Sequence, residues 1–290
     1  MIETVEITCE LCGNHTFLCN CDRNWVTFDK VLHENCNGIT DITNNVKYTD
    51  ISISTMTICF NFTKLINLTL LKESLPENMI KYNPGCKKSK VQKKKGTDSF
   101  YNSFDIKLTF VDRKREPFVF SNVSIFIFPN GRAKAAGIKT INTIYIMLEE
   151  LINIITSVPD CTDPDISTEN VKIQMICSDF KIKPIIENPD GWCLKQEDLK
   201  NILVNEYSKS ATFSALSRYP GINLKIQSTI EPLKQISVLI FRSGSIIITG
   251  AKNASDIANC YQFIIGVISS HSVKLFYYDI NEELKQKKKK

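Results

Sequence analysis

The sequence predicts an α+β fold made of two similar halves, each an antiparallel sheet backed by a helix. The main observation is a repeat: residues 123–139, VSIFIFPNGRAKAAGIK, recur as residues 236–252, ISVLIFRSGSIIITGAK, with six of seventeen positions identical. Each copy is preceded by Glu-Pro and followed by a helix-like segment. A repeat of this length indicates a duplicated structural unit.

Each copy has the pattern of a β-hairpin, in which apolar residues alternate up to a two-residue turn, Asn130-Gly131 or Ser243-Gly244. Side chains alternate between the two faces of a strand, so each copy should present one face of the same kind. The residues expected on these faces are Ser124, Phe126, Phe128 and Ala136 in the first copy and Ser237, Leu239, Phe241 and Thr249 in the second. On an isolated strand the two Phe residues would be interpreted as core residues, but their repetition also suggests a shared function.

The second copy resembles a known signature. From Leu239 to Lys252 it reads LIF-x-SG-x-x-x-x-TGAK, which resembles the signature that occurs in each half of the TATA-box-binding protein family. The first copy keeps Phe128, Gly131, Gly137 and Lys139 of that signature and departs from it at residues 136 and 138. The resemblance extends more weakly over residues 50–275. The insertions and the Ile/Asn/Lys-rich composition resemble the divergent versions carried by large DNA viruses.

The resemblance implies a pseudo-symmetric saddle of two halves, residues 46–160 and 161–280, each a curved antiparallel sheet backed by helices. A member of this family would bind double-stranded A/T-rich promoter DNA through the minor groove, bend it, and recruit TFIIB-like initiation factors and RNA polymerase. The aromatic side chains that would enter base steps are Phe128, Phe241, Phe104 and Tyr219, with Phe100, Tyr101 and Phe110 as alternatives to Phe104. Phe126, Leu239 and Thr249 would line the groove floor. The basic residues near phosphates would be Arg132, Lys134, Lys139, Arg242 and Lys252, and each of these could instead be an ordinary solvated charge.

Periodicity predicts further elements along the chain. A helix over residues 140–156 has Thr140 as its N-cap and an apolar stripe of Ile141, Ile144, Leu148, Leu151 and Ile155. A helix from about residue 255 to 269 has a stripe of Ile257, Cys260, Ile264 and Ile268. Strands are expected at 50–71, 99–111 and 171–182, a helix or turn at 72–81, a linker at 158–169 and a helix at 196–207.

The first 45 residues form an acidic, cysteine-rich appendage. Cys9, Cys12, Cys19 and Cys21 could place four thiolates around a structural Zn²⁺ ion. Because the pairs are close together and the second is CxC, the alternative is a set of reduced thiols. No other cofactor is implied. The odd cysteine total and the absence of a recognisable secretory signal indicate a reducing intracellular compartment, such as a virus factory or the nucleus, with packaging in a virion as a further option.

The charge distribution suits a polyanionic partner. Residues 1–45 hold two basic and seven acidic residues, so the remainder carries +10 of a chain whose net charge is +5. The basic run at 87–95 and the basic C-terminal tail, 281–290, which ends in the run at 285–290, are either solvated segments or phosphate contacts. No stretch is apolar for the length of a membrane span.

Enzyme classes find little support, because the chain lacks a Walker-type loop, a GxGxxG motif and a triad-like arrangement of its three histidines. We therefore predict a binding protein. The alternatives are a protein-interaction platform that has lost DNA binding and, more remotely, an enzyme acting on nucleic acid.

Overall fold

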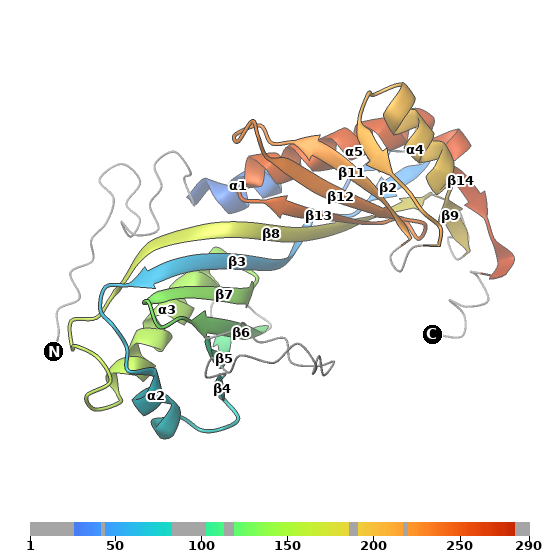
Figure 1. Cartoon of the computed structure of the whole chain (residues 1–290). Helices are drawn as coiled ribbons and strands as arrows, with labels where there is room; N and C mark the ends of the chain where they lie inside the picture. Colours follow the sequence, from blue (N-terminus) through green and yellow to red (C-terminus); the bar gives the residue numbers. More distant parts are fainter. Residues whose placement is uncertain are drawn as a thin grey trace, which may run out of the picture. The chain divides into compact units, whose positions relative to one another are not determined.

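The computed structural model describes residues 26–41, 44–82, 103–112, 119–185, 191–216 and 220–281 (Figure 1). The chain divides into two compact units. Of the described residues, those within 55–174 form the first unit, and those within 26–54 and 175–281 form the second. This division differs from the predicted one in that residues 161–174 group with the first unit and residues 46–54 with the second.

The first unit is an antiparallel sheet with two helices. Its strands are β3 (Ser52–Phe62, of which Thr55–Phe62 belong to this unit), β4 (Ile80–Tyr82), β5 (Phe104–Asp112), β6 (Val119–Ile127) and β7 (Arg132–Ile138), in the order β3-β7-β6-β5-β4. The helices are α2 (Leu68–Ser74) and α3 (Ile141–Thr156). The residues up to Gln174 of the long strand β8 (Thr168–Pro184) complete the unit.

The second unit repeats this plan with additions. Its main sheet has the order β10 (Ser210–Thr212), β11 (Gly221–Gln227), β12 (Gln235–Phe241), β13 (Ser245–Ala251) and the remainder of β8, all antiparallel. The helices are α1 (Val26–Asn35), α4 (Gln196–Asn205) and α5 (Ala254–Leu275). Three short pairings add β1 (Thr40–Asp41) to β2 (Val46–Tyr48), β2 to β8, and β14 (Phe276–Tyr278) to β9 (Trp192–Leu194).

The helices bury one side of each sheet. The predicted stripe of α3 is buried along its whole length, and Thr140 caps the helix by accepting a hydrogen bond from the backbone N–H of Thr143 at 3.1 Å. The predicted stripe of α5 is also buried, and Asn253 caps that helix in the same way, through the N–H of Asp256 at 2.8 Å. The predicted α+β class, with antiparallel sheets backed by helices, is therefore confirmed.

Some element boundaries differ from the prediction. The strand expected at residues 50–71 ends at Phe62, and helix α2 begins within the same stretch. Asn67 explains this start, because its side chain accepts hydrogen bonds from the N–H groups of Thr69 and Leu70 at 3.1 and 3.2 Å. The C-terminal helix is longer than predicted and runs to Leu275.

The two hairpin turns are longer than predicted. In the first, the N–H of Phe128 donates to the carbonyl of Arg132 at 2.8 Å, so the loop has three residues, 129–131, and the N–H of Gly131 donates to the carbonyl of Phe128 at 3.0 Å within it. In the second, Gly244 donates to Phe241 at 2.9 Å, giving the loop 242–244. Both glycines have φ of +77°, which fits the left-handed last position of a three-residue hairpin loop. The prediction of two-residue turns was wrong, although the glycines stand where a positive φ is needed.

Candidate nucleic-acid interface

The first unit has an open sheet face on the side away from its buried core. Ser124 pairs with Ala136 and Phe126 with Lys134 in the β6–β7 ladder. The neighbouring residues Ile125 and Ile127 are fully buried on the other side. We call this side the first face; its residues are Cys59, Asn61, Lys107, Ser124, Phe126, Phe128, Arg132, Lys134 and Ala136. The predicted grouping of Ser124, Phe126, Phe128 and Ala136 on one side follows from this register.

The second unit presents a matching open face. Ser237 pairs with Thr249 and Leu239 with Ile247, so the predicted return of Thr249 to the face of Ser237 is confirmed. We call this side the second face. Its residues are all half-buried: Asn223, Lys225, Ser237, Leu239, Phe241, Ser245, Ile247 and Thr249.

The two faces share a basic position that the sequence patterns did not reveal. Lys107 lies opposite Ser124 in the β5–β6 ladder, and Lys225 lies opposite Ser237 in the β11–β12 ladder. The ammonium group of Lys225 lies 2.6 Å from the hydroxyl of Ser237. Both lysines therefore lie opposite the repeated serine, on strands outside the repeated segments. The alternation of apolar and polar residues along 104–110 and 221–227 is the sequence signal that could have identified them.

Phe104 does not lie on the first face. It pairs with Ile127 and is fully buried with the core residues Ile106 and Leu108. Its predicted role as an inserting side chain is therefore wrong: parity along β5 places it on the helix side of the sheet. Of the other candidates, Tyr219, Phe100 and Tyr101 lie outside the described residues, as does the side chain of Phe110.

Phe128 and Phe241 occupy equivalent places at the ends of β6 and β12. Each is half-buried, and each provides the carbonyl that closes its hairpin loop. Gly221 lies directly across the ladder from Phe241. Each open face therefore holds one large aromatic ring at the end of its hairpin.

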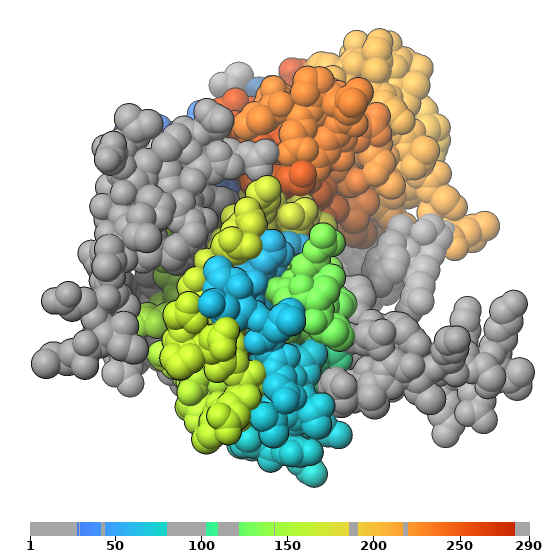
Figure 2. Space-filling view, turned by 60° about the vertical axis from the view of Figure 1, so that its left-hand side comes forward, coloured from blue at the N-terminus to red at the C-terminus, as the bar shows by residue number. Residues whose placement is uncertain are grey.

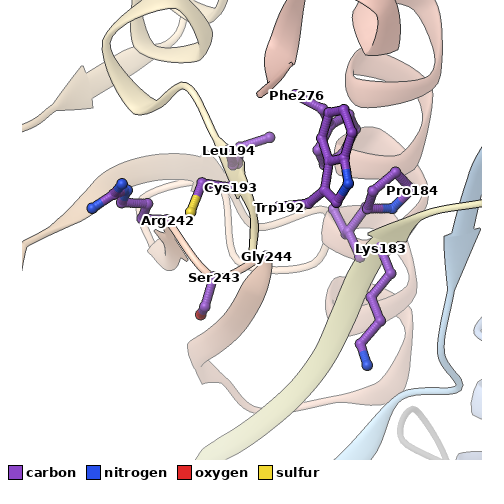
Figure 3. A pocket seen from close by; sticks show the side chains of 10 residues that line it. Lys183, Pro184, Trp192, Cys193, Leu194, Arg242, Ser243, Gly244 and Phe276 are labelled. Carbon is purple, nitrogen blue, oxygen red and sulfur yellow. The ribbon is translucent and has the colours of Figure 1, made fainter. Parts of the chain in front are cut away.

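Arg242 is held by β14 and by the residue after it. Figure 3 shows Arg242 together with Cys193 and Leu194 of β9 among the residues that line one pocket. Its Nε donates to the hydroxyl of Tyr277 at 2.7 Å, its guanidinium lies 5.5 Å from the centre of that ring, and it forms an ion pair with Asp279. The carbonyl of Arg242 also accepts the N–H of Leu194 in β9 at 2.8 Å. These contacts fix the hairpin loop that begins directly after Phe241. The carboxylate of Asp279 also balances the charge of Arg242, which weakens the attraction of this arginine for a phosphate.

The other predicted basic residues differ in their surroundings. Arg132 and Lys139 are exposed and Lys134 is half-buried on the first face. Lys252 forms an ion pair with Glu231 at 3.1 Å. The phosphate contacts proposed for all four residues stay predictions.

A thiol lies on the strand at one end of each unit's sheet, Cys59 on β3 and Cys177 on β8. Burial raises the pKa of Cys59, and the nearby charge of Lys134 partly offsets this rise. Burial likewise raises the pKa of Cys177, which lies opposite Thr249, while a hydrogen bond with Thr249 lowers it. Both groups are therefore neutral thiols near pH 7, not thiolates.

The predicted metal site cannot be placed, because Cys9, Cys12, Cys19 and Cys21 lie outside the described residues, as do the basic runs at 87–95 and 285–290. In the ranges that the structure covers, no three Cys, His, Asp or Glu side chains gather as a metal site would require. None of the helices in those ranges has the length and apolar character needed to cross a membrane.

Comparison with known proteins finds similarity to TATA-binding proteins. Residues 195–271 match the family model described as Transcription factor TFIID (or TATA-binding protein, TBP). A TATA-box-binding protein-like protein of Acanthamoeba polyphaga mimivirus is 26% identical over 263 residues, which is 82% of this chain and 70% of that protein. Among solved structures, Methanococcus jannaschii TBP is 19% identical, with 76% of this chain and 98% of that chain covered and a TM-score of 0.47.

The sequence matches agree with the duplicated hairpins. The family match covers α4 to α5 of the second unit, where the second hairpin lies, and the mimivirus relative extends the likeness over most of the chain. The chain is therefore similar to TBP-like proteins over most of its length, and its residues 195–271 match the TBP family, whose role at the family level is that of a DNA-binding transcription factor.

Proposed function

We propose that this protein is a transcription initiation factor that binds A/T-rich promoter DNA through the minor groove, bends it, and recruits a TFIIB-like factor and RNA polymerase. The observation that carries the proposal is the pair of open sheet faces, each with one half-buried ring, Phe128 or Phe241, at the end of its hairpin. We expect it to act in a reducing intracellular compartment.

The apolar part of each face suits the floor of the minor groove at A·T pairs. There, A·T and T·A pairs show only acceptors, whereas a G·C pair adds the guanine amino donor. Leu239 and Ile247 form a cross-strand pair in the middle of the second face. An apolar pair of this kind leaves the guanine amino group without a hydrogen-bond partner, which costs free energy on the order of 1 to 3 kcal/mol.

The two phenylalanines are suited to open base steps. An apolar side chain inserted into a step partly unstacks it and kinks the duplex towards the major groove, at a cost of about a few kcal/mol per step. The added contacts with a widened groove offset this cost, and flexible TA steps are the easiest to open. This favours A/T-rich sites that contain TA steps at both ends.

Cations on the first face would hold the phosphate backbone. Arg132 is exposed at the start of β7 and Lys134 follows on the same side. Such contacts fix position and register without reading sequence. Binding should therefore weaken with salt, while the preference for A/T-rich DNA persists.

The test is fluorescence-anisotropy binding to a duplex that contains TATAAA and to a G/C-rich duplex of equal length, over a salt series. The proposal expects a preference for the TATA duplex that survives moderate salt and falls at least about tenfold in the Phe128→Ala/Phe241→Ala variant, since each lost contact of this size is worth roughly 1 to 3 kcal/mol. Equal, weak and salt-sensitive binding to both duplexes, indifferent to the two phenylalanines, would refute it.

One observation favours a second candidate, a docking platform for other proteins. Asp179 pairs with Ile247 beside the second face, and its carboxylate accepts a hydrogen bond from Ser54. A carboxylate there is repelled by DNA phosphates. The test measures DNA binding by the unchanged protein and by the Asp179→Asn variant. If neither protein binds DNA detectably, the docking platform becomes the better account.

A further inference from the structure

The second unit carries exposed lysines at the end of β8. Lys181 and Lys183 lie on this strand, and Lys47 of β2 pairs directly with Lys183; we call these three residues the lysine cluster. Like charges directly opposite each other destabilise a sheet. Among the residues that the structure describes, no carboxylate forms an ion pair with any of the three. Asp179, two residues before Lys181, accepts a hydrogen bond from Ser54 instead, so the group stays positive.

The lysine cluster lies on the same side of the sheet as the second face. Lys181 pairs with Ser245 of that face in the β8–β13 ladder, and cross-strand partners lie on one side of a sheet. Lys183 follows at a spacing of two residues and so returns to this side, whereas Phe180 and Ile182 are buried on the helix side. The cluster therefore continues the open side of the second unit.

The lysine cluster begins in the row of Phe241 and extends past it. Phe241 and Lys181 belong to one row across β12, β13 and β8, because the registers of the two ladders place Ser245 between them. Lys183 and its partner Lys47 lie two residues further, which is roughly 7 Å along a strand. If Phe241 opens an outer base step, the phosphates that reach this lysine pair belong to DNA beyond that step.

Strand β2 brings Lys47 to this place. Figure 2 shows β3, in blue, beside β8, in yellow. β2 precedes β3 and follows the same edge of β8, since the N–H of Thr49 donates to the carbonyl of Lys181 at 2.9 Å. Figure 3 shows the side chain of Lys183 extending away from Trp192. None of the three lysines belongs to residues 195–271, so the family match does not assign them a role.

The first unit has neutral side chains at the equivalent place. The N–H groups of Phe62 and Ile182 make the same hydrogen bond, to the carbonyl of the loop glycine in each hairpin, at 2.8 and 2.9 Å. The next residues, Thr63 and Lys183, are therefore equivalent. Thr63 faces Ser167, and their hydroxyls lie 3.2 Å apart, whereas Lys183 faces another lysine. A hydrogen-bonded hydroxyl pair in one unit thus corresponds to a like-charge pair in the other.

The neighbouring charges of the first unit do not make a second cluster. Lys64, which follows Thr63, forms ion pairs with Asp163 and Asp165 at 3.7 and 3.0 Å. Arg132 is exposed, but it is the equivalent of Ser245 and so lies in the row of the hairpin's ring rather than past it. The two units therefore differ in charge beyond that row.

We propose that the lysine cluster binds backbone phosphates of the DNA that continues beyond the bent site, at the end under the second unit and not at the other end. This rests on the proposed function, because it requires the second face to lie on DNA. Ammonium groups hold phosphates without reading bases, and each neutralised phosphate releases counterions, so these contacts add to the salt dependence. The phosphates also offset the repulsion between Lys47 and Lys183.

The experiment compares three duplexes that share a symmetric A/T-rich site, TATATATA. The first has short flanks, the second is extended with G/C-rich DNA at one end by about one helical turn, roughly ten base pairs, and the third is extended at both ends. Because the site reads the same in both directions, the protein can place its second unit at whichever end is extended. Fluorescence anisotropy gives the affinity for each duplex over a salt series.

The unchanged protein should gain from one extension only. It should bind the duplex extended at one end about tenfold more tightly than the short duplex near 0.1 M salt, as expected for two or three added phosphate contacts. Extending the other end as well should add no more than about twofold, because two equivalent orientations then become available. This difference separates a site in one unit from contacts at both ends.

The Lys47→Ser/Lys183→Thr variant gives the second unit the hydroxyl pair of the first. It should lose the gain from extension, keep its affinity for the short duplex within about twofold, and show a salt slope on the extended duplex that is lower by about 2. Its urea midpoint should not fall, because the change removes a repulsion. The matched control is Lys200→Ser/Lys274→Thr, which removes two lysines from α4 and α5 and should keep the gain.

Several outcomes overturn the inference, and they differ from those that overturn the proposed function. No gain from extension, or a gain that the Lys47→Ser/Lys183→Thr variant keeps, overturns it and leaves the proposed function standing if the preference for A/T-rich DNA persists. A second extension that tightens binding about tenfold again would mean that the site is not confined to the second unit. Absence of any preference for A/T-rich over G/C-rich duplexes overturns both.

Discussion

The ring of Phe241 lies directly across the β11–β12 ladder from Gly221, so close that a Cβ at Gly221 would stand 3.1 Å from the ring carbon Cε1. The absence of a side chain at this position therefore sets where the ring can lie. An alanine there would push the ring out of its place.

A TATA-containing duplex that carries the fluorescent base 2-aminopurine at each outer base step reports unstacking as a rise in fluorescence. We predict that Gly221→Ala lowers this rise at the end of the duplex under the second unit, because the ring of Phe241 no longer enters the base step in the same orientation. The free energy of unfolding should fall by about 1 kcal/mol, as expected for one extra methyl group in a filled space. The control is Gly266→Ala in α5, where an added Cβ meets nothing within 4 Å. It should leave the signal unchanged. An unchanged signal in Gly221→Ala would mean that the ring is not held by this contact.

Arg242 and Asp279 give a prediction that separates positioning from phosphate binding. If the arginine fixes the hairpin loop, Arg242→Met and Asp279→Asn should both reduce bending, with the same salt dependence as the unchanged protein. The effect on stability should be small, about 1 kcal/mol or less, because Arg242 is partly exposed. If Arg242 instead contacts phosphate, Arg242→Met should lower the salt slope by about 1 and Asp279→Asn should tighten binding.

Phe104 and Phe128 should respond in opposite ways to truncation. Phe104 is fully buried, so Phe104→Ala should cost about 3 to 5 kcal/mol of unfolding free energy and leave the folded fraction able to bend DNA. Phe128 is half-buried, so Phe128→Ala should cost far less stability and remove the kink at its end. Urea unfolding and 2-aminopurine fluorescence measure the two effects. A large loss of stability in Phe128→Ala would show that this ring is a core residue.

The buried thiols predict a loss of stability at high pH. Burial raises the pKa of Cys36 and of Cys260 from an ordinary value near 9.0 to about 12. A pKa that is raised in the folded state favours the protonated thiol there, so its contribution to stability is complete below pH 9 and is lost as the pH rises from about 9 to 12. The urea midpoint should therefore fall over this window, and it should fall less in a Cys36→Ser/Cys260→Ala variant. A flat profile in the unchanged protein would contradict the assignment.

Local periodicity was enough to predict the hairpins and helix α3. The apolar stripe of α3 and its Thr140 cap depend on residues close together in the sequence, so the pattern contains the information needed. The same principle explains the error at Phe104. A gapless match to a family motif put it on the open face, although it shares parity with Ile106 and Leu108, which are buried.

Other features depend on residues far apart in the sequence. Arg242 forms an ion pair with Asp279, which directly follows β14. That strand has three residues, and its pairing with β9 leaves no recognisable pattern in the sequence. Asn61 of β3, Lys134 of β7 and Gln174 of β8 line one pocket of the first unit, and they are ordinary polar residues in strands until the fold brings them together. The repeat could show that two faces exist, but it could not show which residues of the strands outside the repeated segments, such as Lys107 and Lys225, complete those faces.

The central claim is that the faces carrying Phe128 and Phe241 bend DNA, and the distance between the two ends of a labelled duplex tests it most directly. A TATA-containing duplex with a fluorescence energy-transfer pair at its ends should show higher transfer when the protein binds, in moderate salt. The Phe128→Ala/Phe241→Ala variant, at saturating concentration, should bind without that rise. Saturated binding by the unchanged protein with no change in transfer, or an equal rise in the double variant, would contradict the claim.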